Sequence, residues 1–582
     1  MKHNTPHSAM YTDRKNLPTL ENLKPNNAAL RVMPLGGVGE IGMNCMLFEF
    51  NGEILMVDCG QMLPDEDMLG VDYVIPDITY LLERIDNFVG IVLTHAHEDH
   101  VGALPYIIPQ LPPNTPIYGS ELTISLQKEK LKEHGLSPNL KLLRSREKIQ
   151  LGEYFTIEPL NVTHSIIDSF AIAITTPAGT TIHSGDYKID PAPTDGVSFD
   201  FHGFSSYAES PDEGVLLLLG DSTNADRPGM CPSESSVIPT LTRLIREASG
   251  QIILSCFASS LHRIQTVLNI AAKCGRTVFT AGLNMERNIR VASQIGAIEI
   301  PCDFVPDADK AKNYPREKRL ILTTGSQGEP LSALYRMAFG SHRSVDIQED
   351  DTVILSARLI PGNEKAIYRL INHLFRRGAK IHYSGNTPGI HASGHAYRDD
   401  MRHLINLVNP RFLVPIHGEF RHLREHASLA VEAGMQPDEI LHIENGDCLE
   451  ISSRGAEVIG RIPHGRVFVD GKGIGDVEEI VIRDRKFLSE DGVVMVILSV
   501  SRETGEVLAG PYLHSRGFMS EEGAEAILEE ARQVVLDAYR ETDSEGKEES
   551  TVVQANVKKA LRSFLKQKTR RFPVILPLIM EI

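Results

Sequence analysis

Residues 94–100 read Thr-His-Ala-His-Glu-Asp-His and follow the apolar run Gly-Ile-Val-Leu at 90–93. The run is short and β-rich, so it predicts a buried strand that ends where the polar stretch begins. The first two histidines alternate and can face one metal ion, whereas the aspartate and the last histidine lie past the bend and can reach a second. Imidazole suits zinc or manganese, and the carboxylate keeps such a site from being too soft. The stretch therefore predicts the start of a two-metal centre.

The length and composition are those of an ordinary multidomain globular protein. The chain has 582 residues, 42% of them hydrophobic and 23% charged, and no apolar run approaches membrane-spanning length. The amino terminus is polar and lacks a signal-peptide core, so we expect a cytoplasmic protein with no membrane partner. Seven scattered cysteines without a C-x-x-C pair indicate reduced, mostly buried thiols.

The formal net charge of −18 argues against a general polyanion-binding surface. A nucleic-acid substrate would then be bound locally, by metal ions and a basic groove. Basic clusters at 316–319, 376–380 and 566–571 offer phosphate contacts, although each alone is more often a solvated face. Trp is absent, so base stacking would fall to Phe, Tyr, His or Arg.

Further candidate ligands stand where other apolar strand patterns end. They are Asp58 after 53–57, His164 after 149–162, Asp186 after 181–182 and Asp221 after 214–220. Alone, each can be a capping or packed residue, and Asp58 can equally cap a turn. Beside the histidine cluster they complete a ligand set, in which Asp58 orients a ligand and Asp186 bridges both metals. Because every candidate lies at the carboxyl end of a strand, we expect them on one edge of a sheet.

The order of these motifs resembles that of the metallo-β-lactamase superfamily. Residues 221–225, Asp-Ser-Thr-Asn-Ala, resemble the first motif of its β-CASP branch, and 389–396 and 412–419 resemble the remaining two. With the glycine-rich opening at 36–42 and the later stretch at 467–471, the chain resembles the ribonuclease J family over about residues 30–582. This resemblance implies an α/β fold, namely a metallo-β-lactamase αββα sandwich with an inserted β-CASP α/β domain and a small α/β C-terminal domain.

Composition and resemblance together divide the chain. The polar, irregular start predicts a flexible tail at 1–28, and the Gly-rich, charged stretch at 461–480 predicts a linker. The resemblance implies the first part of the metallo-β-lactamase domain at 29–228, the β-CASP domain at 229–385, the second part of the metallo-β-lactamase domain at 386–460 and the C-terminal domain at 481–582. Around the start of that last domain and within it, the sequence pattern predicts strands near 479–484 and 493–500, helices near 520–540 and up to about 568, and a final strand at 574–580.

The resemblance supports an assignment of site residues. One metal would be held by His95, His97 and His164, the other by Asp99, His100 and His417, with Asp186 between them. His395 corresponds to the residue that assists the leaving 3′ oxygen, and Asp221 would hold its imidazole in the required tautomer. The alternative is that His395 only hydrogen-bonds a phosphate.

Contacts with RNA are implied for a segment of small side chains and consecutive N–H groups, suited to a 5′ monophosphate: His391, Ala392, Ser393, Gly394 and His395. Phe257 and Ser259 would add base stacking and phosphate contacts, although Phe257 suits core packing nearly as well. The resemblance further implies a structural calcium ion that joins Gly70 and Asp72 to Asp470.

The implied activity is that of a two-metal ribonuclease, using Zn²⁺ or Mn²⁺. It would act as a 5′-to-3′ exonuclease on 5′-monophosphate RNA and as an endonuclease, in RNA maturation and decay. The expected partners are RNA, further copies of the chain in a homodimer or homotetramer, and RNA-degradation assembly proteins. A hydrolase of small esters or lactams would have no use for Asp221, His395 or His417. An RNA-binding or assembly subunit would predict lost ligands, and none is lost.

Overall fold

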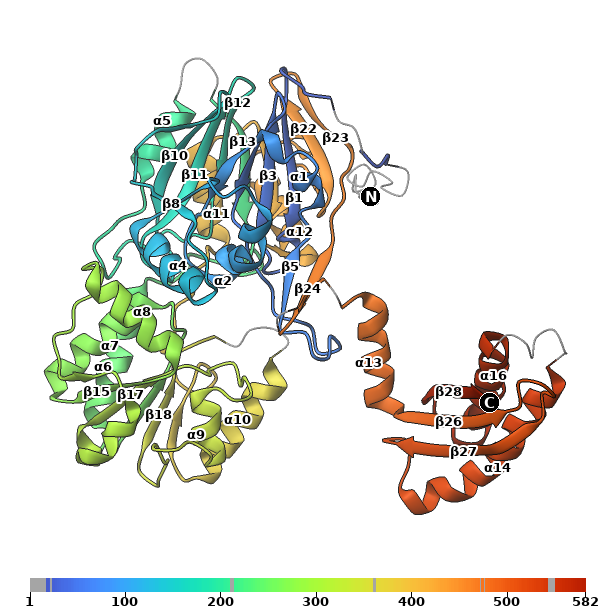
Figure 1. Cartoon of the computed structure of the whole chain (residues 1–582). Coiled ribbons are helices and arrows are strands. Elements are labelled where there is room, and N and C mark those ends of the chain that lie inside the picture. The colour runs from blue at the N-terminus through green and yellow to red at the C-terminus, as the bar shows by residue number, and fades with distance from the viewer. Residues whose placement is uncertain are drawn as a thin grey trace, which may run out of the picture. The chain divides into compact units, whose positions relative to one another are not determined.

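The computed structural model describes residues 17–20, 24–209, 214–358, 363–471, 473–475, 477–542 and 550–582 (Figure 1). They form two compact units. The larger lies within Met1–Met62 and Ile75–Arg466, and the smaller within Leu63–Val74 and Val467–Ile582. Of the tail expected at 1–28, residues 1–16 and 21–23 lie outside the described residues. No helix in the described ranges is long and apolar enough to cross a membrane.

Two sheets pack face to face in the larger unit (Figure 1). In sheet order, the first consists of β23 (Gly455–Arg461), β22 (Asp447–Ser452), β1 (Leu30–Gly36), β3 (Cys45–Phe50), β4 (Glu53–Val57), β6 (Phe88–Val92), β7 (Pro116–Gly119) and β8 (Asn139–Leu142). The second consists of β20 (Phe412–Ile416), β13 (Val215–Asp221), β12 (Gly179–His183), β11 (Ser169–Thr176), β10 (Phe155–Val162) and β9 (Ile149–Leu151). Segments far apart in the sequence meet here, since Leu30 of β1 pairs with Ile451 of β22.

The core between the two sheets is apolar and fully buried. Phe48 and Val57 of the first sheet share it with Phe155, Ile172 and Leu217 of the second. The other face of the second sheet is covered by α5 (Phe201–Ala208), α11 (Arg398–Val408) and α12 (Phe420–Glu432). The first sheet is accompanied by α1 (Thr79–Leu82), α2 (Glu98–Val101), α3 (Leu104–Ile107) and α4 (Glu121–Glu133), and α4 packs on β7 and β8. The layers are therefore helix, sheet, sheet, helix.

A third, all-parallel sheet is inserted between β13 and β20. In sheet order it consists of β16 (Phe304–Val305), β15 (Thr277–Ala281), β17 (Arg319–Thr323), β14 (Ile252–Ser255), β18 (Thr352–Leu355) and β19 (Lys380–His382). Because side chains alternate along a strand, Ile252 and Leu254 face one core and Ile253 faces the other. One core is closed by α6 (Ile238–Glu247), α7 (Leu261–Cys274) and α8 (Leu283–Gln294), the other by α9 (Ala333–Phe339) and α10 (Glu364–Arg376).

The smaller unit holds a three-stranded sheet with helices on one face. Its strands are β27 (Val507–Arg516), β26 (Val493–Val500) and β28 (Val574–Glu581), covered by α14 (Glu521–Glu541) and α16 (Ser550–Thr569). The two predicted helices and the final strand are confirmed. The span 461–480, expected to be a linker, contains β24 (Arg466–Asp470) and β25 (Gly473–Ile474), which pair antiparallel.

The strand predicted near 479–484 is wrong, because α13 (Glu479–Asp491) occupies that position. The β-branched run there has high β propensity, but such propensity reflects packing on a sheet. Ile480 is 56% exposed and Val481 is 37% exposed, so these side chains have no sheet face to pack on. Helical hydrogen bonding within the segment then satisfies its backbone locally.

Candidate metal centre

Parallel strand pairs place the predicted site residues together. In the second sheet β12, β13 and β20 run parallel, so the residues at their carboxyl ends meet, and Asp221 lies beside Ile416. In the first sheet β4 runs parallel to β6, with Val57 beside Val92, so Asp58 and the stretch 94–100 leave the sheet side by side. The site residues therefore come from the edges of two sheets, and the expectation of a single sheet edge is wrong. The two edges meet because both sheets close over one core.

The first ligand group consists of His95, His97, His164 and Asp186, whose candidate ligand atoms all lie within 4.8 Å of one another. Nδ1 of His97 is 2.9 Å from Nε2 of His95 and 3.1 Å from Nε2 of His164. Burial lowers the pKa of His97 to about 4 and also lowers the pKa of His95 and of His164. These imidazoles are therefore neutral at pH 7, the form that binds metal ions.

The second group consists of Asp99, His100, Asp186 and His417, again with all candidate atoms within 4.8 Å. Asp186 Oδ2 is 3.2 Å from His100 Nε2, and Asp99 Oδ2 is 3.3 Å from His417 Nε2. Burial acts to lower the pKa of His417, but Asp186, Asp221 and Asp99 overcome it and raise that pKa to about 10. The second group is thus rich in negative charge, which favours a cation.

The donor chemistry of both groups fits divalent metal ions. Three imidazoles and a carboxylate in one group, and two imidazoles and two carboxylates in the other, are nitrogen and oxygen donors of the kind that zinc and manganese take. Asp186 belongs to both groups and is buried, so one carboxylate serves two positions. All seven predicted ligands are brought together.

Neighbouring groups orient several of these ligands. Asp58 Oδ2 accepts from His100 Nδ1 at 2.6 Å, and its two oxygens also accept from the backbone N–H and the hydroxyl of Thr94 at 2.8 Å each. The Nδ1–H of His164 donates to the carbonyl oxygen of Gly394 at 2.8 Å. In both histidines the proton lies on Nδ1, which leaves Nε2 for a metal. Asp58 therefore orients a ligand and also ties the turn at Thr94.

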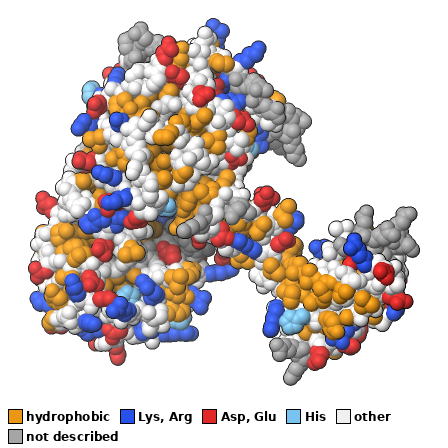
Figure 2. Space-filling model, viewed as in Figure 1, with side chains coloured by type: hydrophobic (Ala, Val, Ile, Leu, Met, Phe, Trp, Pro, Cys, Tyr) orange, Lys and Arg blue, Asp and Glu red, His pale blue; other side chains and the backbone are white. Residues whose placement is uncertain are grey.

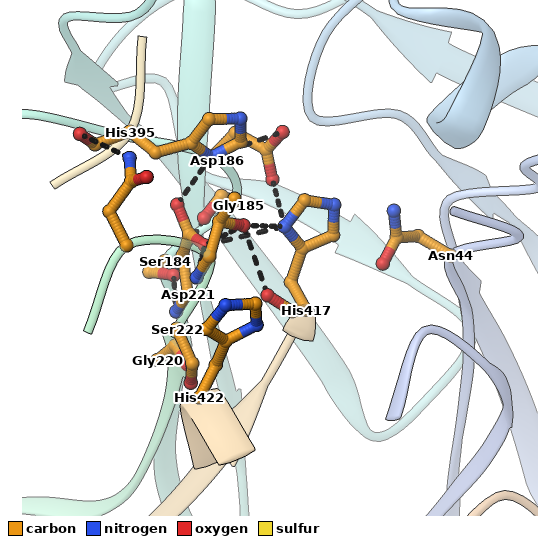
Figure 3. A network of polar contacts seen from close by, with 12 residues as sticks. Asn44, Ser184, Gly185, Asp186, Gly220, Asp221, Ser222, His395, His417 and His422 are labelled. Atoms are coloured by element: carbon orange, nitrogen blue, oxygen red, sulfur yellow. Dashed lines mark hydrogen bonds and ion pairs between the residues drawn. The ribbon is translucent and has the colours of Figure 1, made fainter. Parts of the chain in front are cut away.

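His395 and Asp221 form a pair beside the shared carboxylate (Figure 3). Asp221 is fully buried and its Oδ2 lies 2.8 Å from Nδ1 of His395, while its Oδ1 accepts from the backbone N–H of Thr223 at 2.9 Å. The side chain of His395 is 21% exposed, whereas the side chain of His417, which also lies beside Asp186, is only 2% exposed. His395 is thus held by a buried carboxylate while it remains open to solvent.

The segment before His395 contributes backbone and small side chains. Asn224 Nδ2 donates to Ser393 Oγ at 3.1 Å and to the carbonyl of His395 at 3.3 Å. A Cβ added to Gly394 would lie 2.8 Å from Cε1 of His164, so only glycine fits there. Nδ1 of His391 is buried without a hydrogen-bond partner among the described residues. Ala392 is buried.

Two other sets of predicted residues do not belong to the ligand groups. Phe257 and Ser259 are partly exposed in the turn between β14 and α7. Among the described residues, no hydrogen bond joins either of them to a predicted metal-binding side chain. In the smaller unit, Asp72 accepts from the N–H of Gly471 at 2.8 Å. Asp470 accepts from Arg485 at 2.6 Å, and the same guanidinium donates to the carbonyl of Leu69 at 3.0 Å, next to Gly70.

The prediction from sequence missed residues that contact the ligands without binding a metal themselves. Thr94 holds Asp58, the Thr223 hydroxyl lies 2.6 Å from Nδ1 of His417, and Asn44 Nδ2 lies 3.1 Å from Nε2 of His100. The first two lie within the quoted motifs 94–100 and 221–225, although neither was singled out. Asn44 had only the neighbouring glycine-rich run 36–42 as a signal.

Four family models match the chain. They are the metallo-beta-lactamase superfamily at 38–191, the ribonuclease J beta-CASP domain at 249–374, the Zn-dependent metallo-hydrolase RNA specificity domain at 389–441 and the ribonuclease J C-terminal domain at 480–582. Ribonuclease J of Thermus thermophilus is 41% identical over 559 residues, which cover 95% of each protein. Ribonuclease J2 of Bacillus subtilis is 36% identical over 562 residues, which cover 96% of this chain and 100% of the relative.

Among solved structures, a protein of unknown function from Enterococcus faecalis matches with a TM-score of 0.51 and 17% identity, over 73% of this chain and 100% of that one. At this identity the match bears on the fold alone. It covers less of the chain than the sequence relatives do.

Proposed function

The chain belongs to the ribonuclease J family of metal-dependent ribonucleases, and we propose that it degrades 5′-monophosphate RNA from the 5′ end and also cuts RNA internally. The family models confirm the predicted fold class: a metallo-β-lactamase domain, a β-CASP insertion and a ribonuclease J C-terminal domain. The observation that carries the proposal is the pair of ligand groups that share Asp186, with His395 beside them.

Two divalent ions are assigned to these groups. His95, His97 and His164 would hold one, Asp99, His100 and His417 the other, with Asp186 between them. Ions bound there would polarise the scissile phosphodiester and would lower the pKa of a bound water. We propose Zn²⁺ or Mn²⁺ on the basis of the donor types.

Residues of the chain itself orient the imidazoles of the site and donate the proton that the leaving group needs. Asp221 accepts a hydrogen bond from Nδ1–H of His395, so Nε2 is the nitrogen that can give a proton to the leaving 3′ oxygen. Its partial exposure suits this role, because a substrate must reach it from solvent. Asp58 accepts a hydrogen bond from Nδ1–H of His100, so Nε2, which lies 3.2 Å from Asp186 Oδ2, is the nitrogen directed at the second metal position.

A 5′ monophosphate is assigned to the segment His391 to His395. Nδ1 of His391 is unpartnered among the described residues, and burial together with the charges of Arg263, Arg358 and Lys188 lowers the pKa of this imidazole; these positive surroundings favour a phosphate. Ser393 adds a hydroxyl and Gly394 a backbone close to His164. A terminal phosphate held here, one nucleotide from the ligand groups, supports stepwise 5′-to-3′ cleavage. Phe257 and Ser259 remain proposed contacts for more distant nucleotides.

The remaining assignments are proposals of the same kind. They comprise the domain boundaries given above, a cytoplasmic location, a role in RNA maturation and decay with RNA-degradation assembly partners, a homodimer or homotetramer, and a calcium site at Gly70, Asp72 and Asp470. The outer face of the C-terminal sheet supports self-association: Tyr512 is 61% exposed, Leu576 47%, Leu578 52% and Met580 47%. Figure 2 shows hydrophobic side chains gathered over this unit.

The test is digestion of one RNA sequence that carries a 5′ monophosphate, a 5′ triphosphate or a 5′ hydroxyl. We expect mononucleotides from the monophosphate substrate and mainly internal products from the other two. His391→Ala should remove this preference while internal cleavage persists, and His202→Ala, which truncates an exposed histidine on α5, is the matched control. Equal stepwise degradation of all three RNAs would refute the 5′ pocket.

A further inference from the structure

The glycine-rich segment 36–44 runs beside the second ligand group, although the proposed function gives it no task. Its short strand β2 (Val38–Gly39) pairs in parallel with β21 (Gly418–Glu419), which directly follows His417. The backbone N–H of His417 donates to the carbonyl of Gly37 at 2.8 Å. One end of the segment therefore fixes the backbone of one ligand.

The other end of the segment contacts the remaining two ligands through Asn44, which is 7% exposed. Its backbone N–H and its side-chain amide both donate to the carbonyl of Asp99, at 2.9 and 3.1 Å. The same amide nitrogen lies 3.1 Å from Nε2 of His100; because that lone pair is assigned to the metal, the amide's hydrogen bond in the loaded site is the one to the Asp99 carbonyl. The carbonyl of Asn44 accepts from the N–H of Gly60 at 2.8 Å, which ties it to the turn after Asp58.

Two glycines in the segment share an unusual backbone but differ in their surroundings. Gly37 has φ +86° and Gly39 has φ +80°, a region that disfavours side chains. A Cβ on Gly37 would collide with Oδ1 of Asn44, whereas a Cβ on Gly39 would meet nothing within 4 Å. Gly37 is therefore required for two reasons, its conformation and the close approach of Asn44, and Gly39 for the first alone.

The first ligand group is held by other contacts. His164 donates to the carbonyl of Gly394, and Nδ1 of His95 lies 3.0 Å from the Thr94 hydroxyl. The contacts of segment 36–44 described above thus reach Asp99, His100 and His417, the three ligands that belong to the second group alone. We propose that this segment sets the geometry of the second metal position and that Asn44 is its positioning residue. The inference rests on the proposed two-metal site.

The experiment counts and titrates metal ions in the full chain, without RNA. Native mass spectrometry gives the number of Zn²⁺ or Mn²⁺ ions bound, and competition with a chromophoric chelator gives each affinity. We expect two ions in the wild type. Asn44→Ala should leave one ion at wild-type affinity and weaken the other at least tenfold, in line with the effect of lost orienting contacts at metal sites, roughly 10–100-fold.

Two glycine variants make the comparison specific. Gly37→Ala should weaken the same ion as Asn44→Ala, and Gly39→Ala, with matched backbone strain, should keep both ions at wild-type affinity. Combining Asn44→Ala with His417→Ala should add nothing to the loss caused by His417→Ala. Combining it with His97→Ala should impair both positions.

Retention of one tight ion shows that a variant is folded, so a misfolded variant is recognised by loss of both. Equal weakening of both ions in folded Asn44→Ala, or no weakening of either, would overturn the inference. If Gly37→Ala and Gly39→Ala behave alike, the contact with Asn44 is not the cause. RNA cleavage is assayed separately: a wild type that binds two ions but ignores the 5′ end refutes the proposed pocket and leaves this inference standing.

Discussion

Asp58→Asn tests how strongly Asp58, which is not a predicted metal ligand, affects metal binding by its hydrogen-bond partner His100. The substitution keeps the shape of the side chain and one oxygen for the N–H of Thr94. It replaces the acceptor of the His100 Nδ1 proton, now 2.6 Å away, by an amide or an uncharged oxygen. A hydrogen bond to a charged group contributes about 1.5–3 kcal/mol. At 1.4 kcal/mol for each factor of ten, that corresponds to roughly 10–150-fold.

We therefore expect Asp58→Asn to weaken the ion held by His100 roughly 10–150-fold and to leave the ion held by His95 unchanged, as measured by chelator competition. Thr94→Ala is the comparison, because it removes a hydroxyl donor to Asp58 at 2.8 Å and keeps the carboxylate. The carboxylate that accepts from His100 Nδ1 remains in this variant, so the ion held by His100 should lose less affinity than in Asp58→Asn. Wild-type affinity for both ions in Asp58→Asn would refute the reasoning, as would a larger effect from Thr94→Ala.

Three further predictions concern other parts of the chain. Gly394→Ala should cost about 1–3 kcal/mol of stability by crowding His164, seen as a lower Tm, and an unchanged Tm would contradict the close packing. Arg485→Ala should raise the affinity for Ca²⁺ in calorimetry, because the guanidinium and the ion compete for Asp470; an unchanged affinity would contradict this competition. Burial raises the pKa of the thiols of Cys45, Cys59, Cys231, Cys256 and Cys448. These thiols should therefore resist alkylation in the native protein at pH 7.4, and rapid labelling would contradict their burial.

The ligand set was predictable because each member follows an apolar strand in the sequence. Strand ends can be read from local patterns, and parallel strands bring such ends together. What the sequence did not show was that the ends belong to two sheets. That follows from the packing of Phe48 against partners such as Ile172, which no local pattern records.

Asn44 and helix α13 were missed for opposite reasons. Asn44 contacts His100 across 56 positions of sequence, and a single asparagine after a glycine-rich run carries no signal of that contact. For α13 the local signal was present but misleading, since Ile480 and Val481 favour a strand and remain exposed on a helix. Long-range contacts and the absence of a sheet partner decide these two positions.

The central claim is that the chain cleaves RNA at the metal centre formed by these ligand groups, and one digestion tests it. A 5′-labelled monophosphate RNA is incubated in Mn²⁺ or Zn²⁺ with the wild type, with Asp99→Ala combined with His100→Ala, and with Glu98→Ala. Glu98 lies in the same stretch, but it is exposed and pairs with Lys130, so it is the matched control. We predict labelled mononucleotide from the wild type and Glu98→Ala, and intact RNA from the double variant. Cleavage by the double variant at the wild-type rate would contradict the claim.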